Sequence, residues 1–247
     1  TLDAEEAIPL PDVIESLSLA GLSRFLRNPV EHFFNRRLNV YFDRGEAQIE
    51  DDENFALNAL QGYQIKARIL EVDASDTLES TLDATLQRLR LEGQFPMAAS
   101  GDLLIDQIRT TALHVVQQEW AFRQGWNPEK MEPLDLKPLS FTTVSGDTLT
   151  LEDSLENLYA HGTDPGRHVT FKRVPSEILK TKSAPRLDKA LDLWITQLAA
   201  NASGLRLESY LIGSDGVVHF PAIEDSSVAH SHLALIVNGW LEGLKAP

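Results

Sequence analysis

Apolar residues at helical spacing dominate the first half of the chain. The densest stretch, 17–42, predicts two short helices in line. Ser18 is a suitable N-cap for the first helix, and Pro29 suits the first position of the second, with Asn28 as its cap. Periodicity alone favours a core helix pair flanked by solvated arginines over a binding site. The apolar positions of the pair are Leu22, Phe25, Leu26, Val30, Phe33, Phe34 and Leu38.

The segment 36–130 is predicted to be mostly helical, with an acidic, solvated connection at 43–54. Three further helices are expected there, the second beginning near Ser75 and the third at Ser100. Their expected buried faces are Leu57, Leu60, Tyr63, Ala67 and Leu70, then Leu78, Leu82, Leu86 and Leu89, then Leu104, Ile108, Ala112 and Val115.

Helical periodicity fades after Trp126, and the segment 139–220 is predicted to hold a sheet. In the last expected strand, apolar and polar residues alternate as they do in a half-buried strand, and this strand leads into a hairpin. Expected strands are 140–144, 147–159, 167–174 and 204–212, with helices at 187–200 and from Ser226 or Ser227 onward. This order predicts one α/β domain over 16–247, a small mixed sheet with a helical lobe, preceded by a linker or extended lead-in at 1–15.

Composition narrows the classes of function. The net charge of −15 over 247 residues argues against a free-standing nucleic-acid binder. Without cysteine there is no disulfide, thiolate metal site or cysteine nucleophile. No apolar run reaches the roughly 18 residues of a membrane helix, and no secretory signal is visible, so we expect a cytoplasmic protein without membrane contact. No phosphate-binding loop is present, so ATP binding by this chain is not expected.

The spacing of a few polar residues in the predicted strands resembles the active-site motif of a metal-dependent nuclease. Enzymes of the PD-(D/E)XK type place an acidic residue on one strand and an acid-x-lysine on the next, where the carboxylates hold Mg²⁺. Lys172 stands where that lysine should be, but Thr170 replaces the acid. Asp153 and Glu156 lie near the position of the other carboxylate. A hydroxyl cannot replace a carboxylate as a ligand of comparable charge, so the pattern favours an inactive relic over an active centre.

The helix-pair stretch also resembles a known family, the C-terminal domain of RecC, the gamma subunit of exodeoxyribonuclease V (the RecBCD enzyme). The shared L-x-x-F-x-x-x-P-x-x-x-F-F-x-x-x-L spacing falls on Leu22, Phe25, Pro29, Phe33, Phe34 and Leu38. Further similar blocks are 55–65, 93–102, 193–204 and 215–223.

The resemblance implies a degenerate PD-(D/E)XK (restriction endonuclease-like) fold with no catalytic residues, metal or cofactor of its own. It implies partners: RecB, RecD, the rest of RecC, and double-stranded DNA in the assembled complex. It further implies a role in subunit assembly and in guiding or splitting duplex DNA during double-strand-break repair and homologous recombination. The parent complex would be an ATP-dependent helicase and nuclease. The chain stops before the family's usual end, so we expect a truncated domain.

Two alternatives stay open at this point. One is a residual Mg²⁺-dependent nuclease built on Asp153 or Glu156 with Lys172. The other concerns DNA contact, through the turn at 159–168 or another strand connection acting as a strand-separating pin, or through arginines facing phosphate. Those arginines are Arg24, Arg27, Arg36 and Arg37.

Overall fold

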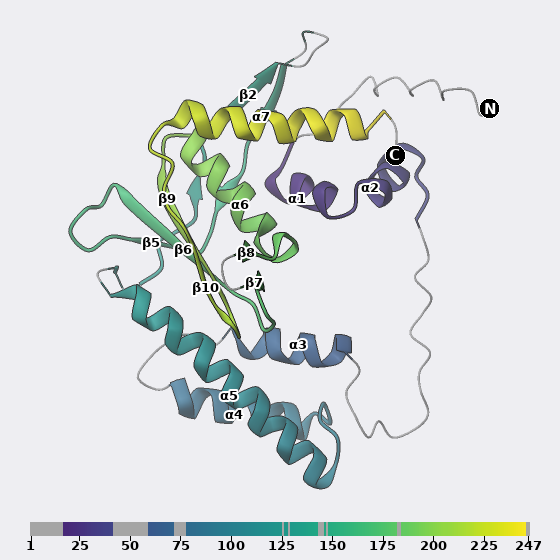
Figure 1. Cartoon of the computed structure of the whole chain (residues 1–247), viewed down its shortest axis with the longest axis vertical. Coiled ribbons are helices and arrows are strands. Elements are labelled where there is room, and N and C mark those ends of the chain that lie inside the picture. Colours follow the sequence, from purple (N-terminus) through teal and green to yellow (C-terminus); the bar gives the residue numbers. More distant parts are fainter. Residues whose placement is uncertain are drawn as a thin grey trace.

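A four-stranded sheet lies between two groups of helices in the computed structural model of the chain (Figure 1). The structure describes residues 17–41, 59–71, 78–124, 126–127, 129–142, 146, 148–181 and 184–245. The expected lead-in at 1–15, the acidic connection at 43–54 and the expected helix start near Ser75 therefore lie outside the described residues.

The described helices form two groups, the α6 layer and the α5 layer, on opposite faces of the sheet. The α6 layer consists of α1 (Leu19–Arg27), α2 (Pro29–Arg37), α6 (Leu187–Ala202) and α7 (Ser226–Gly243). The α5 layer consists of α3 (Ala59–Ile69), α4 (Leu78–Leu91) and α5 (Ala98–Arg123).

The strands of the central sheet follow the order β10–β9–β6–β5. β6 and β9 pair in parallel, and β5 and β10 add antiparallel strands at the two edges. Parallel neighbours require a crossover connection, and α6 lies within the one that joins β6 to β9. The sheet is therefore small and mixed, as the sequence predicts. Its strands are β5 (Leu158–Ala160), β6 (Arg167–Arg173), β9 (Arg206–Gly213) and β10 (Gly216–Phe220).

Shorter strands form two-stranded pairs beside this sheet. They are β1 (Leu134–Asp135) with β4 (Ser154–Leu155), β2 (Leu139–Thr142) with β3 (Thr148–Leu151), and β7 (Leu179–Thr181) with β8 (Ala184–Pro185). The prediction of one strand over 147–159 is wrong, because that segment is divided among β3, β4 and β5. Asn157, between the last two, has a φ of 56°, a left-handed conformation that a regular strand cannot contain.

The strand β9 is buried on both faces. Leu207 and Leu211 face the α6 layer, and Ile212 faces the core of the α5 layer. The prediction of a half-buried strand is therefore wrong for this element. Its alternating pattern correctly predicts one buried face, but Glu208 and Ile212 on the other face are buried as well.

The helix pair α1–α2 is confirmed at the level of individual caps. The Ser18 hydroxyl accepts a hydrogen bond from the Gly21 backbone amide at 3.1 Å. Asn28 ends α1 and begins α2, where its side-chain oxygen accepts from the Glu31 amide at 3.1 Å. Pro29 occupies the first turn of α2, where no intrahelical partner for an amide is needed. This local chemistry explains why the two helices meet at a sharp break.

The α6 layer holds the larger of the core clusters. Leu22 and Phe25 of α1 are buried against α6 and α7, as the sequence predicts, whereas Val30 of α2 and Leu38 at its C-cap are exposed in this chain. Helix α7 begins with Asp225 as its N-cap, whose carboxylate accepts from the Ser227 amide, so the prediction of a serine cap is corrected. Buried residues contributed by α6 and α7 are Ile195, Leu198, Ala199, Ala200, Ala229, Leu233, Val237, Trp240 and Leu241.

The α5 layer packs on the other face of the sheet through α5. The predicted buried faces of the second and third helices are confirmed at Leu82, Leu86, Leu89, Ile108, Ala112 and Val115. The predicted face of the α3 helix is wrong at Leu60 and Tyr63, which are exposed, and confirmed at Leu70, while Leu57 lies outside the described residues. The other buried side chains of the segment are Ile65 and Ile69.

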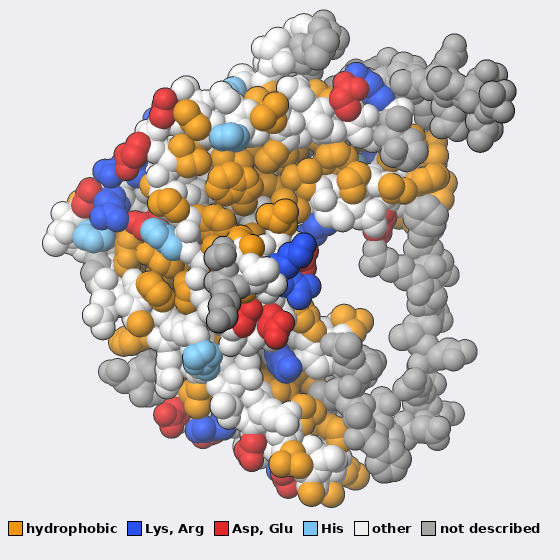
Figure 2. Space-filling model, viewed as in Figure 1, with side chains coloured by type: hydrophobic (Ala, Val, Ile, Leu, Met, Phe, Trp, Pro, Cys, Tyr) orange, Lys and Arg blue, Asp and Glu red, His pale blue; other side chains and the backbone are white. Residues whose placement is uncertain are grey.

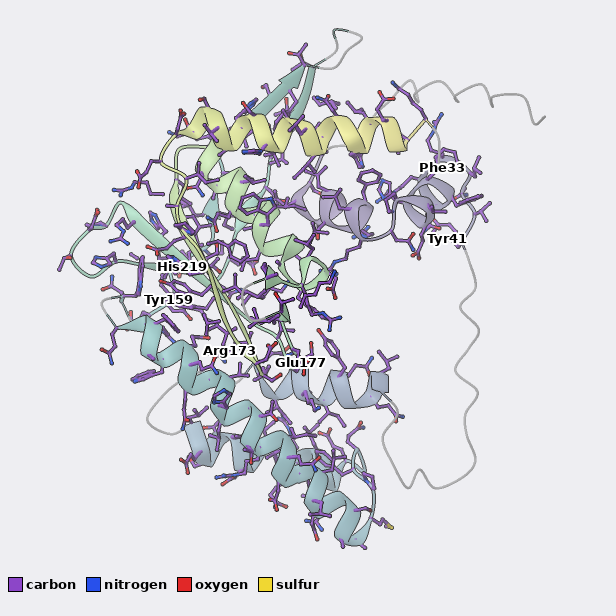
Figure 3. All side chains as sticks on the ribbon, viewed as in Figure 1. Phe33, Tyr41, Tyr159, Arg173, Glu177 and His219 are labelled. Atoms are coloured by element: carbon purple, nitrogen blue, oxygen red, sulfur yellow. The ribbon has the colours of Figure 1, made fainter. Side chains whose placement is uncertain are left out.

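A buried ion-pair network ties α5 to the sheet. The carboxylate of Glu119 lies between the guanidinium groups of Arg173, from the end of β6, and Arg123, one turn further along α5. Arg173 also donates to the Leu70 carbonyl at 2.7 Å, and Arg123 lies over the Tyr159 ring at 4.3 Å. Figure 3 shows Arg173 and Tyr159 on the part of the sheet that α5 approaches. Buried charges with this many partners fix the position of α5 on the sheet.

Candidate functional site

The lysine of the nuclease-like spacing is bound to a carboxylate that the sequence analysis did not select. Strand β6 carries Lys172 toward α6, where its ammonium group lies 2.6 Å from Asp192 Oδ2. The same ammonium group donates to the Lys189 carbonyl at 3.4 Å. Both side chains of the ion pair are about one third exposed, 31% for Lys172 and 36% for Asp192. The pair therefore lies at the edge of the core.

Asp192 also binds the helix-pair segment. Its Oδ1 accepts a hydrogen bond from the Ser23 hydroxyl at 2.9 Å and another from the Arg27 guanidinium. Burial alone would raise the pKa of Asp192, but the hydrogen bond and charge of Lys172, joined by the two α1 donors, hold that pKa below its ordinary value. Asp192 is therefore an anion that joins α1, α6 and β6.

The two other acidic candidates lie in different surroundings. Asp153 Oδ2 accepts from the Leu19 backbone amide at 2.9 Å, and Asp153 Oδ1 accepts from the Ser154 amide at 2.9 Å. Since Leu19 is the first residue of α1, Asp153 binds one of the amides that a helix start leaves without a partner. Glu156 is exposed between β4 and β5. The contacts of Asp153 are thus directed to backbone amides, and those of Lys172 to Asp192.

Thr170 lies inside the sheet. It pairs with Leu158 of β5 and Ser209 of β9, and it is 8% exposed. Within the part of the chain that the structure describes, no three His, Cys, Asp or Glu side chains gather where they could hold a metal ion. Thr170 therefore supplies a hydroxyl at the position where Mg²⁺ chemistry calls for a carboxylate.

The four candidate arginines lie in the last turns of α1 and α2. Arg27 alone reaches the Lys172–Asp192 pair. Arg24 and Arg36 are exposed on α1 and α2, and Arg37 is partly buried. Contact of these arginines with phosphate stays a prediction.

The turn at 159–168 joins β5 to β6 and is held by its own polar groups. Asp164 Oδ1 accepts from the Gly166 amide at 3.1 Å, and the His161 ring accepts from the Thr163 amide at 3.3 Å. Trp126 packs against His161, with ring centroids 5.0 Å apart. The turn is therefore a compact, partly exposed end of a hairpin.

A cavity of about 640 Å³ opens beside the Lys172–Asp192 pair. It lies where α1, α3, β6 and the start of α6 meet, and Figure 2 shows Lys and Arg side chains beside Asp and Glu at a hollow between the two layers. Three cations line the cavity, among them Lys189, whose ammonium lies 5.5 Å from the centroid of the Tyr63 ring. The lining side chains are Leu26, Arg27, Tyr63, Lys172, Val174, Leu187, Asp188, Lys189 and Leu191.

Comparison with known families identifies the family of the chain. A family model described as the RecC C-terminal domain matches residues 14–247. The chain belongs to the RecC C-terminal domain family. The resemblance seen in the helix-pair stretch is thereby confirmed over nearly the whole length of the chain.

Curated relatives of this RecC C-terminal domain carry one name, RecBCD enzyme subunit RecC. The protein from Escherichia coli K12 is 26% identical over 97% of this chain, and the one from Haemophilus influenzae is 31% identical over 40% of it. The protein from Buchnera aphidicola is 22% identical over 94% of the chain. The chain spans about a fifth of the length of the first of these relatives, 19%, and 8% and 19% of the other two. A solved structure described as the crystal structure of SSO0001 covers 70% of this chain and 84% of its own, at 11% identity and a TM-score of 0.30, which is too distant to support an argument.

The RecC C-terminal domain has functional candidates that sequence reasoning missed. Asp192 lies between Leu191 and Leu193 in an apolar helix. A charged residue at that place in the sequence was the one feature that could have indicated its role. Lys189 and Ser23 gave no signal, because their roles arise only when α1, α3 and α6 come together. Among the described helices of the RecC C-terminal domain, none combines the length and apolar character needed to cross a membrane.

Proposed function

We propose that this chain is a non-catalytic, nuclease-like domain of the RecC subunit of a RecBCD-type helicase-nuclease. Its fold is a degenerate PD-(D/E)XK fold. In the bacterial cytoplasm it helps to assemble RecC with RecB and RecD, and it guides or splits duplex DNA during double-strand-break repair and recombination. Membership of the RecC C-terminal domain family and the names of the relatives support the complex.

The single observation that supports a non-catalytic role is the state of Lys172. A catalytic lysine of this type acts on water at a metal held by carboxylates. Here its ammonium is neutralised by Asp192, which itself receives two further donors, and Thr170 occupies the position of the acid. A lysine held in this way is a structural cation that joins β6 to α6.

A digestion assay tests this part of the proposal. The purified chain is incubated with linear duplex and single-stranded DNA in Mg²⁺ or Mn²⁺, beside the variants Lys172→Ala and Lys180→Ala. Lys180 is an exposed lysine on β7 and serves as the matched control. We expect no cleavage beyond a level shared by all three proteins. Cleavage that disappears in Lys172→Ala but persists in Lys180→Ala would instead establish a residual metal-dependent nuclease.

Assembly requires a separate experiment. Full-length RecC containing this region is co-expressed with RecB and RecD from the same organism, and a second RecC lacks the residues of this chain. We expect the shortened RecC to lose RecB or RecD on purification, or to form a complex that unwinds duplex DNA poorly. A shortened RecC that assembles and supports unwinding as the complete one does would overturn the proposal.

A further inference from the structure

The cavity beside Lys172 has the composition of a small-molecule site. Its volume, about 640 Å³, falls in the range of pockets that take a ligand of nucleotide size. Most of its lining is apolar, from Leu26, Val174, Leu187 and Leu191, with a few charged groups that converge on it. Apolar walls with a small number of placed charges are what distinguishes a ligand pocket from an ordinary surface groove.

The charges of the cavity are positive in a chain that is strongly negative. Arg27, Lys172 and Lys189 are opposed by Asp188, which lines the cavity, and by Asp192, which holds the first two. Three cations against two carboxylates leave one positive charge, whereas the whole chain carries −15. A single negative charge on a ligand would leave this cluster neutral. A phosphodiester carries one such charge.

The remaining lining suits the body of a nucleotide. The Tyr63 side chain is 42% exposed and lies beside Lys189, so ring area is available at the cavity. Aromatic rings next to cations are the combination with which proteins bind single-stranded nucleic acid, because every base has a face that can stack. A carboxylate peptide would satisfy the charge but would make less use of the ring.

We propose that this cavity holds one nucleotide of single-stranded DNA, with its phosphodiester against Lys189 and its base against Tyr63. The inference rests on the proposed function, because a domain that splits duplex DNA produces single strands. It adds a binding site beside the lysine of the nuclease-like spacing, and that lysine stays paired with Asp192 in the wall of the cavity.

Fluorescence anisotropy of a labelled oligothymidylate with this chain tests the site at about 50 mM salt, where non-specific electrostatic contacts are strong enough to measure. The variants are Lys189→Gln and Tyr63→Ala, with Lys180→Gln as the matched lysine outside the cavity. We expect Tyr63→Ala to weaken binding by about fivefold or more, as loss of one stacked base does. Lys189→Gln should lower the slope of log affinity against log salt by about 0.7, the value of one phosphate contact on a single strand. Lys180→Gln should leave both quantities unchanged.

Three results would overturn the inference. One is an oligothymidylate affinity that Lys189→Gln and Tyr63→Ala leave unchanged. A second is the absence of oligothymidylate binding at low salt. In either case the proposed function still stands if RecC assembly depends on this region, so the two failures are distinguishable. The third is an abasic phosphodiester chain, or an acidic peptide of equal charge, that binds as tightly as the oligothymidylate. That result would assign the cavity to anions in general.

Discussion

Asp153 should stabilise the fold although its sequence context suggested a metal ligand. Replacing Asp153 by alanine removes the acceptor for the Leu19 amide at 2.9 Å and for the Ser154 amide at 2.9 Å. Because Leu19 is buried, its amide cannot regain a full hydrogen bond to water, and an unsatisfied buried donor costs about 1–3 kcal/mol. Loss of a negative charge at the start of α1 adds about 0.3–1 kcal/mol. We therefore expect a loss of about 2 kcal/mol in the free energy of unfolding.

Urea unfolding followed by tryptophan fluorescence measures this loss, and thermal unfolding should show a fall in Tm of about 4–8 °C for a chain of this size. Glu156→Ala is the matched control, because Glu156 is exposed and its removal should stay within about 0.5 kcal/mol. Asp153→Asn keeps an acceptor and should lose less than the alanine variant. Equal effects of Asp153→Ala and Glu156→Ala would refute the reasoning. A rise in Tm on adding Mg²⁺ that Asp153→Ala abolishes would restore the metal-ligand interpretation.

Three further predictions concern the core and its pH dependence. Glu119→Gln should destabilise the chain by about 3–5 kcal/mol in the same urea assay, because it leaves the buried guanidinium of Arg173 without its carboxylate. Gly101→Ala should destabilise by about 1–3 kcal/mol, since a β carbon there would lie 2.0 Å from a backbone oxygen, whereas Gly62→Ala, in open space on α3, should be neutral or stabilising. Burial lowers the pKa of His168 below its ordinary 6.5. The stability that neutral His168 contributes is therefore present above about pH 6.5 and is lost as the pH falls toward the lowered folded-state pKa. In His168→Gln, the free energy of unfolding should depend less on pH over this range.

The helix pair was predictable because its signals are local. Ser18, Asn28 and Pro29 each act on amides within one turn of their own position, and the structure bears out all three. The face of α3 was not predictable in the same way. Tyr63 and Ile65 lie on different stripes of that helix, and only the position of the sheet and of α5 decides which stripe is buried.

The candidate site was only partly accessible from the sequence for a related reason. Thr170 and Lys172 are two apart on one strand, so their spacing could be read directly. The partner of Lys172 is 20 residues away, on a helix that follows two short strands. The partner of Asp153 is 134 residues away in the chain. No pattern within a window of sequence contains such a pair, and neither contact could be predicted.

The Lys172–Asp192 ion pair also bears on how such a domain could change in evolution. A mutation of Thr170 to aspartate would create an acid-x-lysine sequence on β6. The new carboxylate would, however, lie at a buried strand position, where an unpaired charge is costly. Its lysine would already be committed to Asp192, and removing Asp192 would release α1 from α6 at the same time. A complete acid-x-lysine centre at this position would thus require several coordinated substitutions, with unstable intermediates between them.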